Sequence, residues 1–204
     1  RAKRAQRALA TSTTAQRNGI LLAISRALVD HCEQILHANA QDCQRAEERG
    51  MAAGLVDRLR LDESRIRAIS SAVLDVIALE DPVGTVIRGG RTDDGLRVTQ
   101  LRVPMGVIGM IYEARPNVTV DASILCLKAG NAVILRGGSA ALNTNETLVA
   151  VIRAAIDSLG FSADLVQTVD LWGRDGARAM MRARGGIDVL IPRGGEGLIR
   201  AVVE

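Results

Sequence analysis

Apolar residues in the first part of the chain recur at the spacing of one helix face. Over Thr14–Gly50 they lie three or four positions apart, which predicts an amphipathic helix. A second such segment follows Asp62, a residue type that often caps a helix, and it ends before Asp81-Pro82 because the residue before a proline avoids helical backbone. The pattern therefore predicts a mainly helical region over residues 1–84.

The pattern changes over residues 85–104, where two short runs rich in β-branched residues occur. They lie on either side of Asp94-Gly95, a pair that favours a tight turn between antiparallel strands. Their outward residues are arginine, threonine and glutamine. We therefore expect a β-hairpin that projects from the body or pairs with another chain.

From residue 105 onward, short apolar runs alternate with amphipathic segments. This alternation indicates a parallel sheet covered on both faces, so we expect an α/β fold with a doubly wound sheet over residues 105–204. Asn143 or Thr144 is expected to cap the second helix of this region, and Gly160 to end it. The expected strands are 106–112, 131–135, 164–169 and 187–191, and the expected helices are 118–130, 143–160, 175–184 and 195–204.

Two of the expected strands run into an arginine followed by two glycines, Arg136-Gly137-Gly138 and Arg193-Gly194-Gly195. In an open α/β sheet, ligands bind beyond the carboxyl ends of the strands. Glycines let the backbone approach a phosphate, and an arginine adds a charge-assisted hydrogen bond. The two motifs together indicate a phosphorylated nucleotide. The alternative for either copy is a left-handed turn with a solvated arginine, and the fingerprints GxGxxG and GxxxxGK[ST] are both missing from the sequence.

The stretch YEARPNVTVD, from Tyr112 to Asp121, places charged and polar residues directly after an apolar strand. Asn117 follows Pro116 and precedes an apolar helix, so it could be an N-cap or a first-turn residue. Its other possible role is to donate a hydrogen bond to an oxyanion that forms at the same edge of the sheet. The spacing alone leaves both interpretations open.

Composition restricts the kinds of partner. The net charge is +3 with 24% charged residues, a balance that does not demand nucleic acid. Tyr112, Phe161 and Trp172 are the only aromatic residues, which argues against a base-stacking surface. The tripeptide RGG occurs four times, but its copies are scattered among expected strands and helices. No apolar run approaches the ~18 residues of a membrane helix. We therefore expect neither a nucleic-acid nor a membrane partner.

The three cysteines are far apart and have no CxxC spacing, which is typical of a reduced cytosolic protein. We expect Cys126 to be a small buried residue in mid-helix, Cys32 to lie on an apolar stripe and Cys43 to be exposed. None follows a strand or begins an expected helix, so none is a candidate nucleophile. His31 and His37 are expected to be solvated, and no cluster has the spacing of metal ligands.

Two stretches resemble the gamma-glutamyl phosphate reductases, a family within the aldehyde dehydrogenase superfamily: VPMGVIGMIYEARPNVTVDASILCLKAGNAVILRGGSA and DVLIPRGGEGL. The resemblance extends over essentially the whole chain. It implies an NADPH-dependent reduction of L-glutamyl 5-phosphate to L-glutamate 5-semialdehyde with release of phosphate, a step of proline biosynthesis. In that superfamily a cysteine thiolate forms a thioester with the acyl group, and hydride transfer then reduces it.

The resemblance also implies cofactor-binding roles for five residues. Arg136 stands where the superfamily has a basic residue, usually lysine, at the adenosine ribose, and an arginine suits the 2′-phosphate of NADP(H). Gly137 and Gly138 follow it in the same segment. Gly194 and Gly195 match glycines at a helix N-terminus near the cofactor diphosphate.

For the substrate, L-glutamyl 5-phosphate, the resemblance implies one further position, and location alone suggests a second. Asn117 matches the segment whose asparagine helps to form the oxyanion hole, and Arg115 is a substrate-binding candidate by its location. The hairpin over residues 85–104 resembles the family's oligomerisation arm, so a homo-oligomer is expected. The resemblance also implies a cytoplasmic enzyme, with glutamate 5-kinase as a candidate partner.

Both ends of the sequence fall within expected helices, since it begins at Arg1 in a helical pattern and stops at Glu204. We therefore expect part of a longer enzyme. The family's catalytic cysteine lies in a separate domain further along, so the nucleophile is expected outside these residues and the fragment alone is expected to be inactive. The alternative is a short, non-catalytic module that binds phosphate or a nucleotide.

Overall fold

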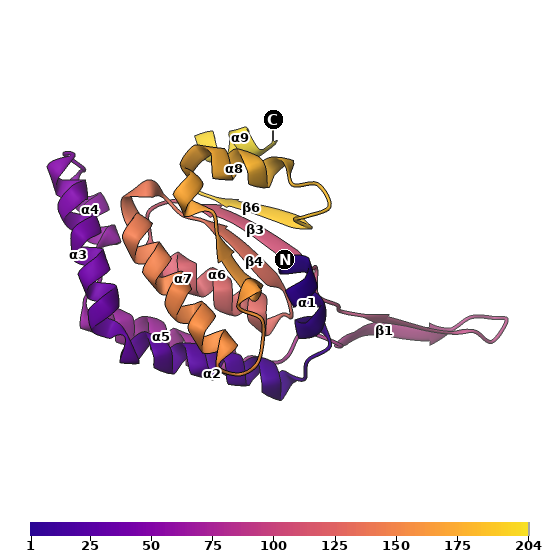
Figure 1. Ribbon diagram of the computed structural model, residues 1–204. Helices are drawn as coiled ribbons and strands as arrows, with labels where there is room; N and C mark the ends of the chain where they lie inside the picture. Colours follow the sequence, from indigo (N-terminus) through magenta and orange to yellow (C-terminus); the bar gives the residue numbers. More distant parts are fainter. Residues whose placement is uncertain (204) are drawn as a thin grey trace.

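The computed structural model describes residues 1–203, without the side chains of 201 and 203, so position 204 of the last expected helix lies outside the described residues. At its centre is a four-stranded parallel sheet with the order β5–β4–β3–β6 (Figure 1). The strands are β3 (Val107–Tyr112), β4 (Ala132–Arg136), β5 (Val166–Thr168) and β6 (Val189–Arg193).

The direction of winding reverses at β3, which makes the sheet doubly wound. The chain steps from β3 to β4 to β5 through α6 (Pro116–Lys128) and α7 (Leu142–Asp157), then returns across the sheet through α8 (Gly173–Arg182) to β6. Because parallel crossovers are right-handed, α8 covers the opposite face from α6 and α7. α1 (Ala2–Ala10) shares a groove with α8 and β4, so it covers the same face as α8. The predicted α/β fold is confirmed.

Of the N-terminal helices, α2, α3 and α5 form a second layer outside α6 and α7. Asp62 caps α5 as predicted, because its carboxylate accepts the Arg65 N–H at 2.7 Å. The single helix predicted over Thr14–Gly50 is wrong in one respect, since His31 leaves helical geometry (φ −105°, ψ 21°) and the chain turns there to pack on α7. The short helix α4 was not predicted. The bounds are α2 (Thr14–Asp30), α3 (Cys32–Glu48), α4 (Ala53–Leu59) and α5 (Glu63–Ala78).

The N-terminus of α7 differs from the prediction. The helix begins at Leu142, directly after a 3₁₀ turn, so Asn143 and Thr144 lie in its first turn rather than at its cap. Their N–H groups donate instead to the carboxylate of Asp42 on α3, at 3.3 and 2.7 Å. The cap therefore comes from a different helix, which a local sequence pattern does not reveal.

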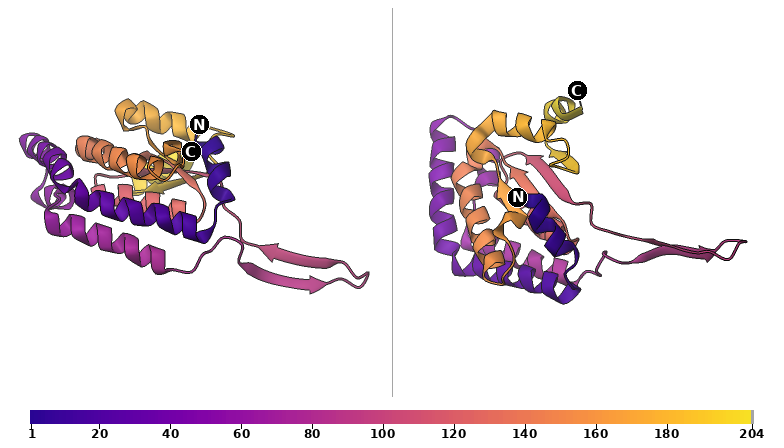
Figure 2. Two further views of the ribbon diagram at one scale, coloured as in Figure 1. Left: turned by 60° about the horizontal axis from the view of Figure 1, so that its bottom comes forward. Right: turned by 45° about the vertical axis from the view of Figure 1, so that its right-hand side comes forward.

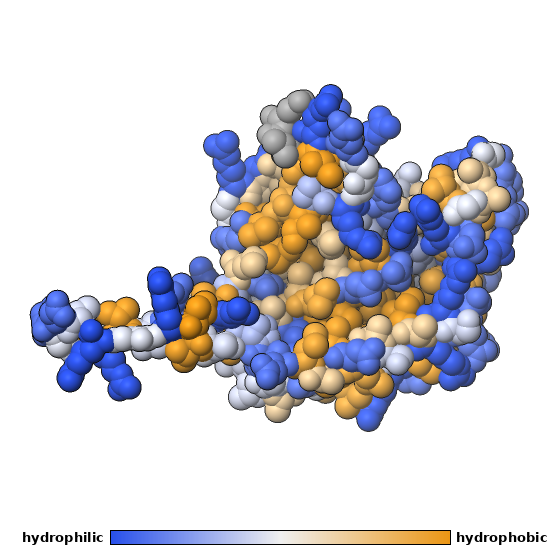
Figure 3. Space-filling view, turned by 180° about the vertical axis from the view of Figure 1, so that it is seen from behind, coloured by the Kyte–Doolittle hydropathy of each residue, from blue (hydrophilic) through white to orange (hydrophobic). Residues whose placement is uncertain are grey.

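The predicted hairpin is confirmed and stands clear of the body in both views of Figure 2. Its strands β1 (Val86–Arg91) and β2 (Arg97–Leu101) are antiparallel and fully exposed, and Gly95 in the turn has a φ of 91° that favours glycine. Apolar side chains are exposed on the hairpin and on the body (Figure 3). On the hairpin they are Val86, Ile87, Leu96, Val98 and Leu101. No helix within residues 1–203 is long and apolar enough to cross a membrane.

A buried ion pair joins α2 to the segment after α5. Arg17 is only 2% exposed and binds the carboxylate of Asp81. Burial by itself would raise the pKa of Asp81, but hydrogen bonds from Thr14 and from the Val83 N–H, together with the charge of Arg17, lower that pKa below its ordinary value.

We expect this pair to make the fold sensitive to acid. A carboxyl group whose folded-state pKa is lowered stabilises the fold above its unfolded-state pKa of about 3.9, and this stabilisation is lost as the pH falls through the folded-state value. The free energy of unfolding should therefore decrease below about pH 4, and less steeply in Asp81→Asn. Urea unfolding at a series of pH values measures both slopes, and equal slopes would contradict the assignment.

Candidate functional site

The three strand ends singled out in the sequence lie along one edge of the sheet. After β4, Gly138 packs so tightly on the β3–α6 loop that a Cβ there would lie 2.7 Å from the Ala114 nitrogen. After β6, the Gly195 N–H donates to Glu113 Oε1 at 3.0 Å. The loop after β3, the strand between β4 and β6, therefore contacts both arginine–glycine–glycine segments, and the fold brings the predicted site residues to a common rim.

Charged side chains line a cleft on this rim at the reversal point between β3 and β6. The cleft has a volume of about 190 Å³ and is lined by Glu113, Arg115, Arg193 and Gly194. Arg193 lies opposite Tyr112 in the parallel register. Arg115 and Arg193 lie near the N-terminus of α9 (Glu196–Val203), and this arrangement suits an anionic ligand. In this structure, however, the Gly195 N–H that precedes α9 already donates to the Glu113 carboxylate.

Asn117 lies in the first turn of α6, beside this cleft. Arg115 is the N-cap and Pro116 the first helical residue, so the interpretation of Asn117 as N-cap is wrong and that of a first-turn residue is confirmed. Its Nδ2 donates to Asp121 Oδ2 at 3.3 Å. Burial raises the pKa of Asp121, an effect that the charge of Arg193 and the Asn117 amide oppose. The Asn117 side chain is thus held in place at the rim.

At the end of β4, Gly137 and Gly138 pack closely against other parts of the protein. The Gly137 N–H donates to Asp170 Oδ1 at 2.6 Å, and a Cβ on Gly137 would lie 2.1 Å from Asn145 Nδ2. Arg136 is half-buried, and its Nε donates to the Gly173 carbonyl at 3.3 Å. Close packing therefore explains why residue 137 is a glycine, while Arg136 is the residue of this segment suited to a phosphate.

Residues 1–202 match the Aldehyde dehydrogenase family. The chain belongs to this family. Two curated relatives named gamma-glutamyl phosphate reductase, from Bifidobacterium longum subsp. infantis and Leifsonia xyli subsp. xyli, are 56% and 50% identical over 202 residues, 99% of this chain. The chain spans 47% and 48% of their lengths.

Solved structures of the family agree with this assignment. The gamma-glutamyl phosphate reductase of Thermotoga maritima has a TM-score of 0.96 at 42% identity, covering 99% of this chain and 49% of that one. The Saccharomyces cerevisiae protein of the same name has a TM-score of 0.91 at 32% identity, covering 98% and 51%. The resemblance seen in the sequence is confirmed.

None of the three cysteines of this aldehyde dehydrogenase family member is among the residues that line the rim cleft, although Cys43 belongs to a buried cluster on which Ala114 packs. Cys32 is the first residue of α3, contrary to our expectation, and Cys43 is buried rather than exposed. Burial raises the pKa of all three thiols, that of Cys126 to about 12. A thiol with a raised pKa is a poor nucleophile, which supports our expectation that none of the three is the catalytic cysteine. That expectation stays a prediction.

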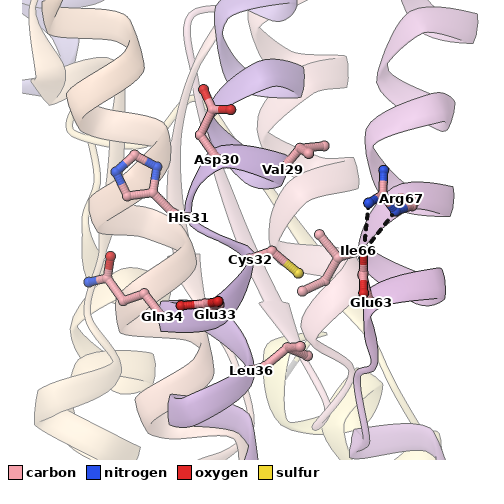
Figure 4. Close-up of a pocket in the computed structure, with 10 residues that line it drawn as sticks. All are labelled: Val29, Asp30, His31, Cys32, Glu33, Gln34, Leu36, Glu63, Ile66 and Arg67. Atoms are coloured by element: carbon pink, nitrogen blue, oxygen red, sulfur yellow. Dashed lines mark hydrogen bonds and ion pairs between the residues drawn. The ribbon is translucent and has the colours of Figure 1, made fainter.

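A second cavity, of about 480 Å³, lies between α2, α3 and α5 (Figure 4). Cys32 is among its lining residues, and the Glu63–Arg67 ion pair lies on its α5 side. All of its lining residues come from residues 29–36 and 63–67, so it shares none with the strand-end rim. We assign it no part in the candidate site.

Two residues at or below the rim, Glu113 and Asp170, were not among the predicted site residues. Glu113 had a visible signal, a charge placed directly after a buried strand. Asp170 had none, because its contact with Gly137 joins residues 33 positions apart. In this family member, sequence patterns thus predicted residues at the rim but not Asp170, which binds the Gly137 backbone from below.

Proposed function

We propose that this chain is the cofactor-binding part of an NADPH-dependent gamma-glutamyl phosphate reductase, which converts L-glutamyl 5-phosphate to L-glutamate 5-semialdehyde. The observation that carries the proposal is the rim, where Arg136 and the arginine-lined cleft lie at the carboxyl ends of adjacent parallel strands. The name shared by relatives at 50–56% identity supports it.

Within this proposal, the chain's own residues bind and orient. Arg136 would bind the 2′-phosphate of NADP(H) through its terminal nitrogens, and Gly194 and Gly195 would bind the diphosphate at the start of α9. The Gly195 N–H would then bind the diphosphate in place of the Glu113 carboxylate. The nicotinamide supplies the hydride when bound.

At the substrate end of the rim, Asn117 would donate to the developing oxyanion and Arg115 would bind the substrate's anionic groups. The catalytic thiolate would come from the part of the protein by which the relatives are longer. We further propose a cytoplasmic homo-oligomer that pairs through the exposed hairpin β1–β2, with glutamate 5-kinase as a candidate partner.

Replacing Arg136 by alanine tests the cofactor assignment. Hydrogen bonds to charged groups contribute about 1.5–3 kcal/mol, so the preference for NADP⁺ over NAD⁺ should fall by at least about tenfold. Calorimetric titration of the chain with each dinucleotide measures the preference. Arg88→Ala, in the matching tripeptide of the hairpin, is the control and should leave it unchanged. An unaltered preference in Arg136→Ala would remove the role we give to this residue.

A further inference from the structure

The turn after β5 is tied to the loop after β4 by a buried carboxylate. Asp170 is 7% exposed, and its Oδ1 accepts the Gly137 N–H at 2.6 Å. Its own N–H donates to Thr168 Oγ1 at 3.1 Å, which fixes the start of the turn. The backbone of the residue next to Arg136 is therefore held from a neighbouring strand.

The same turn also contacts the Arg136 side chain. Gly173, which begins α8, has a φ of 51° and a carbonyl that accepts Arg136 Nε at 3.3 Å. Within residues 1–203 the guanidinium makes no other hydrogen bond, which leaves both of its terminal nitrogens free to donate. Asp170 thus orients the backbone beside Arg136, and Gly173, three residues later, orients its side chain.

Little space is left for the turn or the loop to move separately. A Cβ on Gly176 would lie 2.7 Å from the Val169 carbonyl, and one on Gly137 would lie 2.1 Å from Asn145 Nδ2. The first contact packs α8 against the turn and the second packs the loop against α7, so the Asp170–Gly137 hydrogen bond joins two closely packed segments. The position of Arg136 therefore depends on the geometry of the turn.

The Gly137 N–H could also donate to a neutral side-chain oxygen, so this hydrogen bond alone does not require a carboxylate at position 170. Within the described residues, neither Asp170 Oδ2 nor the neighbouring Asn145 Nδ2 has a hydrogen-bond partner. Burial raises the pKa of Asp170, and the Gly137 N–H, the Thr168 hydroxyl, the Asn145 amide and, least of all, the charge of Arg136 oppose that rise. The hydrogen bond to Gly137 is therefore the main link between the Asp170 carboxylate and Arg136.

We propose that Asp170 is a positioning residue for cofactor selection: by joining the Gly137 N–H to the turn whose Gly173 carbonyl binds Arg136 Nε, it keeps the terminal nitrogens of Arg136 directed at the 2′-phosphate. The inference rests on the proposed function, because Asp170 can act only if Arg136 binds that phosphate. It concerns selection between NADP(H) and NAD(H), not the overall stability of the fold.

The test is a double-mutant cycle in the 204-residue chain, titrated with NADP⁺ and NAD⁺. Trp172 is the only tryptophan and lies exposed on this turn, so its fluorescence reports binding at the rim. Asp170→Ala should lower the preference for NADP⁺ about tenfold, and Asp170→Asn, which keeps the oxygen but not the charge, about threefold. In an Arg136→Ala background, Asp170→Ala should cause no further loss.

Asp188→Ala is the matched control, because Asp188 accepts the Val107 N–H at 2.8 Å at the opposite end of the sheet. It should lower the unfolding temperature and leave the preference unchanged. Hydrogen exchange of the Gly137 amide, slow in the wild type and in Asp170→Asn, should be fast in Asp170→Ala. If alanine prevents folding, Asp170→Asn decides the question, and an unchanged preference overturns the proposal.

The remaining outcomes separate this inference from the proposed function. If Arg136→Ala loses the preference but both Asp170 variants keep it, the positioning role is wrong and the cofactor assignment stands. If Arg136→Ala keeps the preference, or if the wild-type chain binds neither dinucleotide, the cofactor assignment fails and the positioning role fails with it. A loss from Asp170→Ala that is equally large without Arg136 also overturns the proposal, because the effect would then be purely structural.

Discussion

Replacing Asp42 by alanine should lower the free energy of unfolding by about 3 kcal/mol. The Asp42 side chain is fully buried, and its carboxylate accepts the Thr144 N–H and the Thr144 hydroxyl, both at 2.7 Å. It also accepts from Asn143 N–H at 3.3 Å and from Arg45 at 2.7 Å. Alanine would leave the buried Thr144 N–H and hydroxyl hydrogen without an acceptor, although Thr144 Oγ1 would still accept from Asn39 at 3.2 Å, and it would leave α7 without its cap. Each unsatisfied donor costs about 1–3 kcal/mol.

Urea unfolding followed by circular dichroism measures this change, with Asn143→Ala as the matched control. Asn143 is one of the two residues that the local pattern favoured as the cap, but its side-chain amide only donates to Gln41 at 2.9 Å on the surface. Its replacement should change the free energy of unfolding by no more than about 0.5 kcal/mol. Equal costs for the two variants would mean that Asp42 is not the cap of α7.

The contrast between Asp62 and Asp42 shows how far local pattern reaches. Asp62 caps the helix that directly follows it, so its role could be predicted from neighbouring residues. Asp42 caps a helix that begins 100 residues later, and no spacing in the sequence connects the two. The break at His31 is similar, because the apolar periodicity continues through it while the packing of α3 on α7 requires a turn.

The candidate site also has a part that the sequence pattern predicted and a part that it did not. Apolar strands followed by arginine and glycine predicted where the rim would lie, because the carboxyl ends of parallel strands meet at one edge. The bonds that hold the rim are long-range, from Gly137 to Asp170 and from Gly195 to Glu113. They were not predictable, since either N–H could equally have bound a phosphate or water. The residues that contact a ligand leave a pattern in the sequence, while those that orient them do not.

Replacing Asn117 by alanine, in the protein extended to the length of its relatives, should lower kcat by about 10²–10³-fold, since one oxyanion donor contributes about 2.7–4 kcal/mol in the transition state. The KM for L-glutamyl 5-phosphate should change little, because the charge on the oxygen develops only as the reaction proceeds. Steady-state oxidation of NADPH at saturating cofactor measures both constants.

If Asn117 had only a structural role, its replacement would change the free energy of unfolding and leave kcat nearly unchanged. Its hydrogen bond to Asp121 is 3.3 Å long and half-exposed, so alanine should cost less than about 1 kcal/mol of unfolding free energy. Asp121→Asn is the control for lost orientation: it keeps an oxygen that can accept from Asn117, so kcat should fall far less.

A kcat within about threefold of the wild type in Asn117→Ala would leave Asn117 as a first-turn residue of α6. A large fall in kcat with nearly unchanged stability requires that the amide contact the reacting oxygen, because only a contact made in the transition state separates the two measurements.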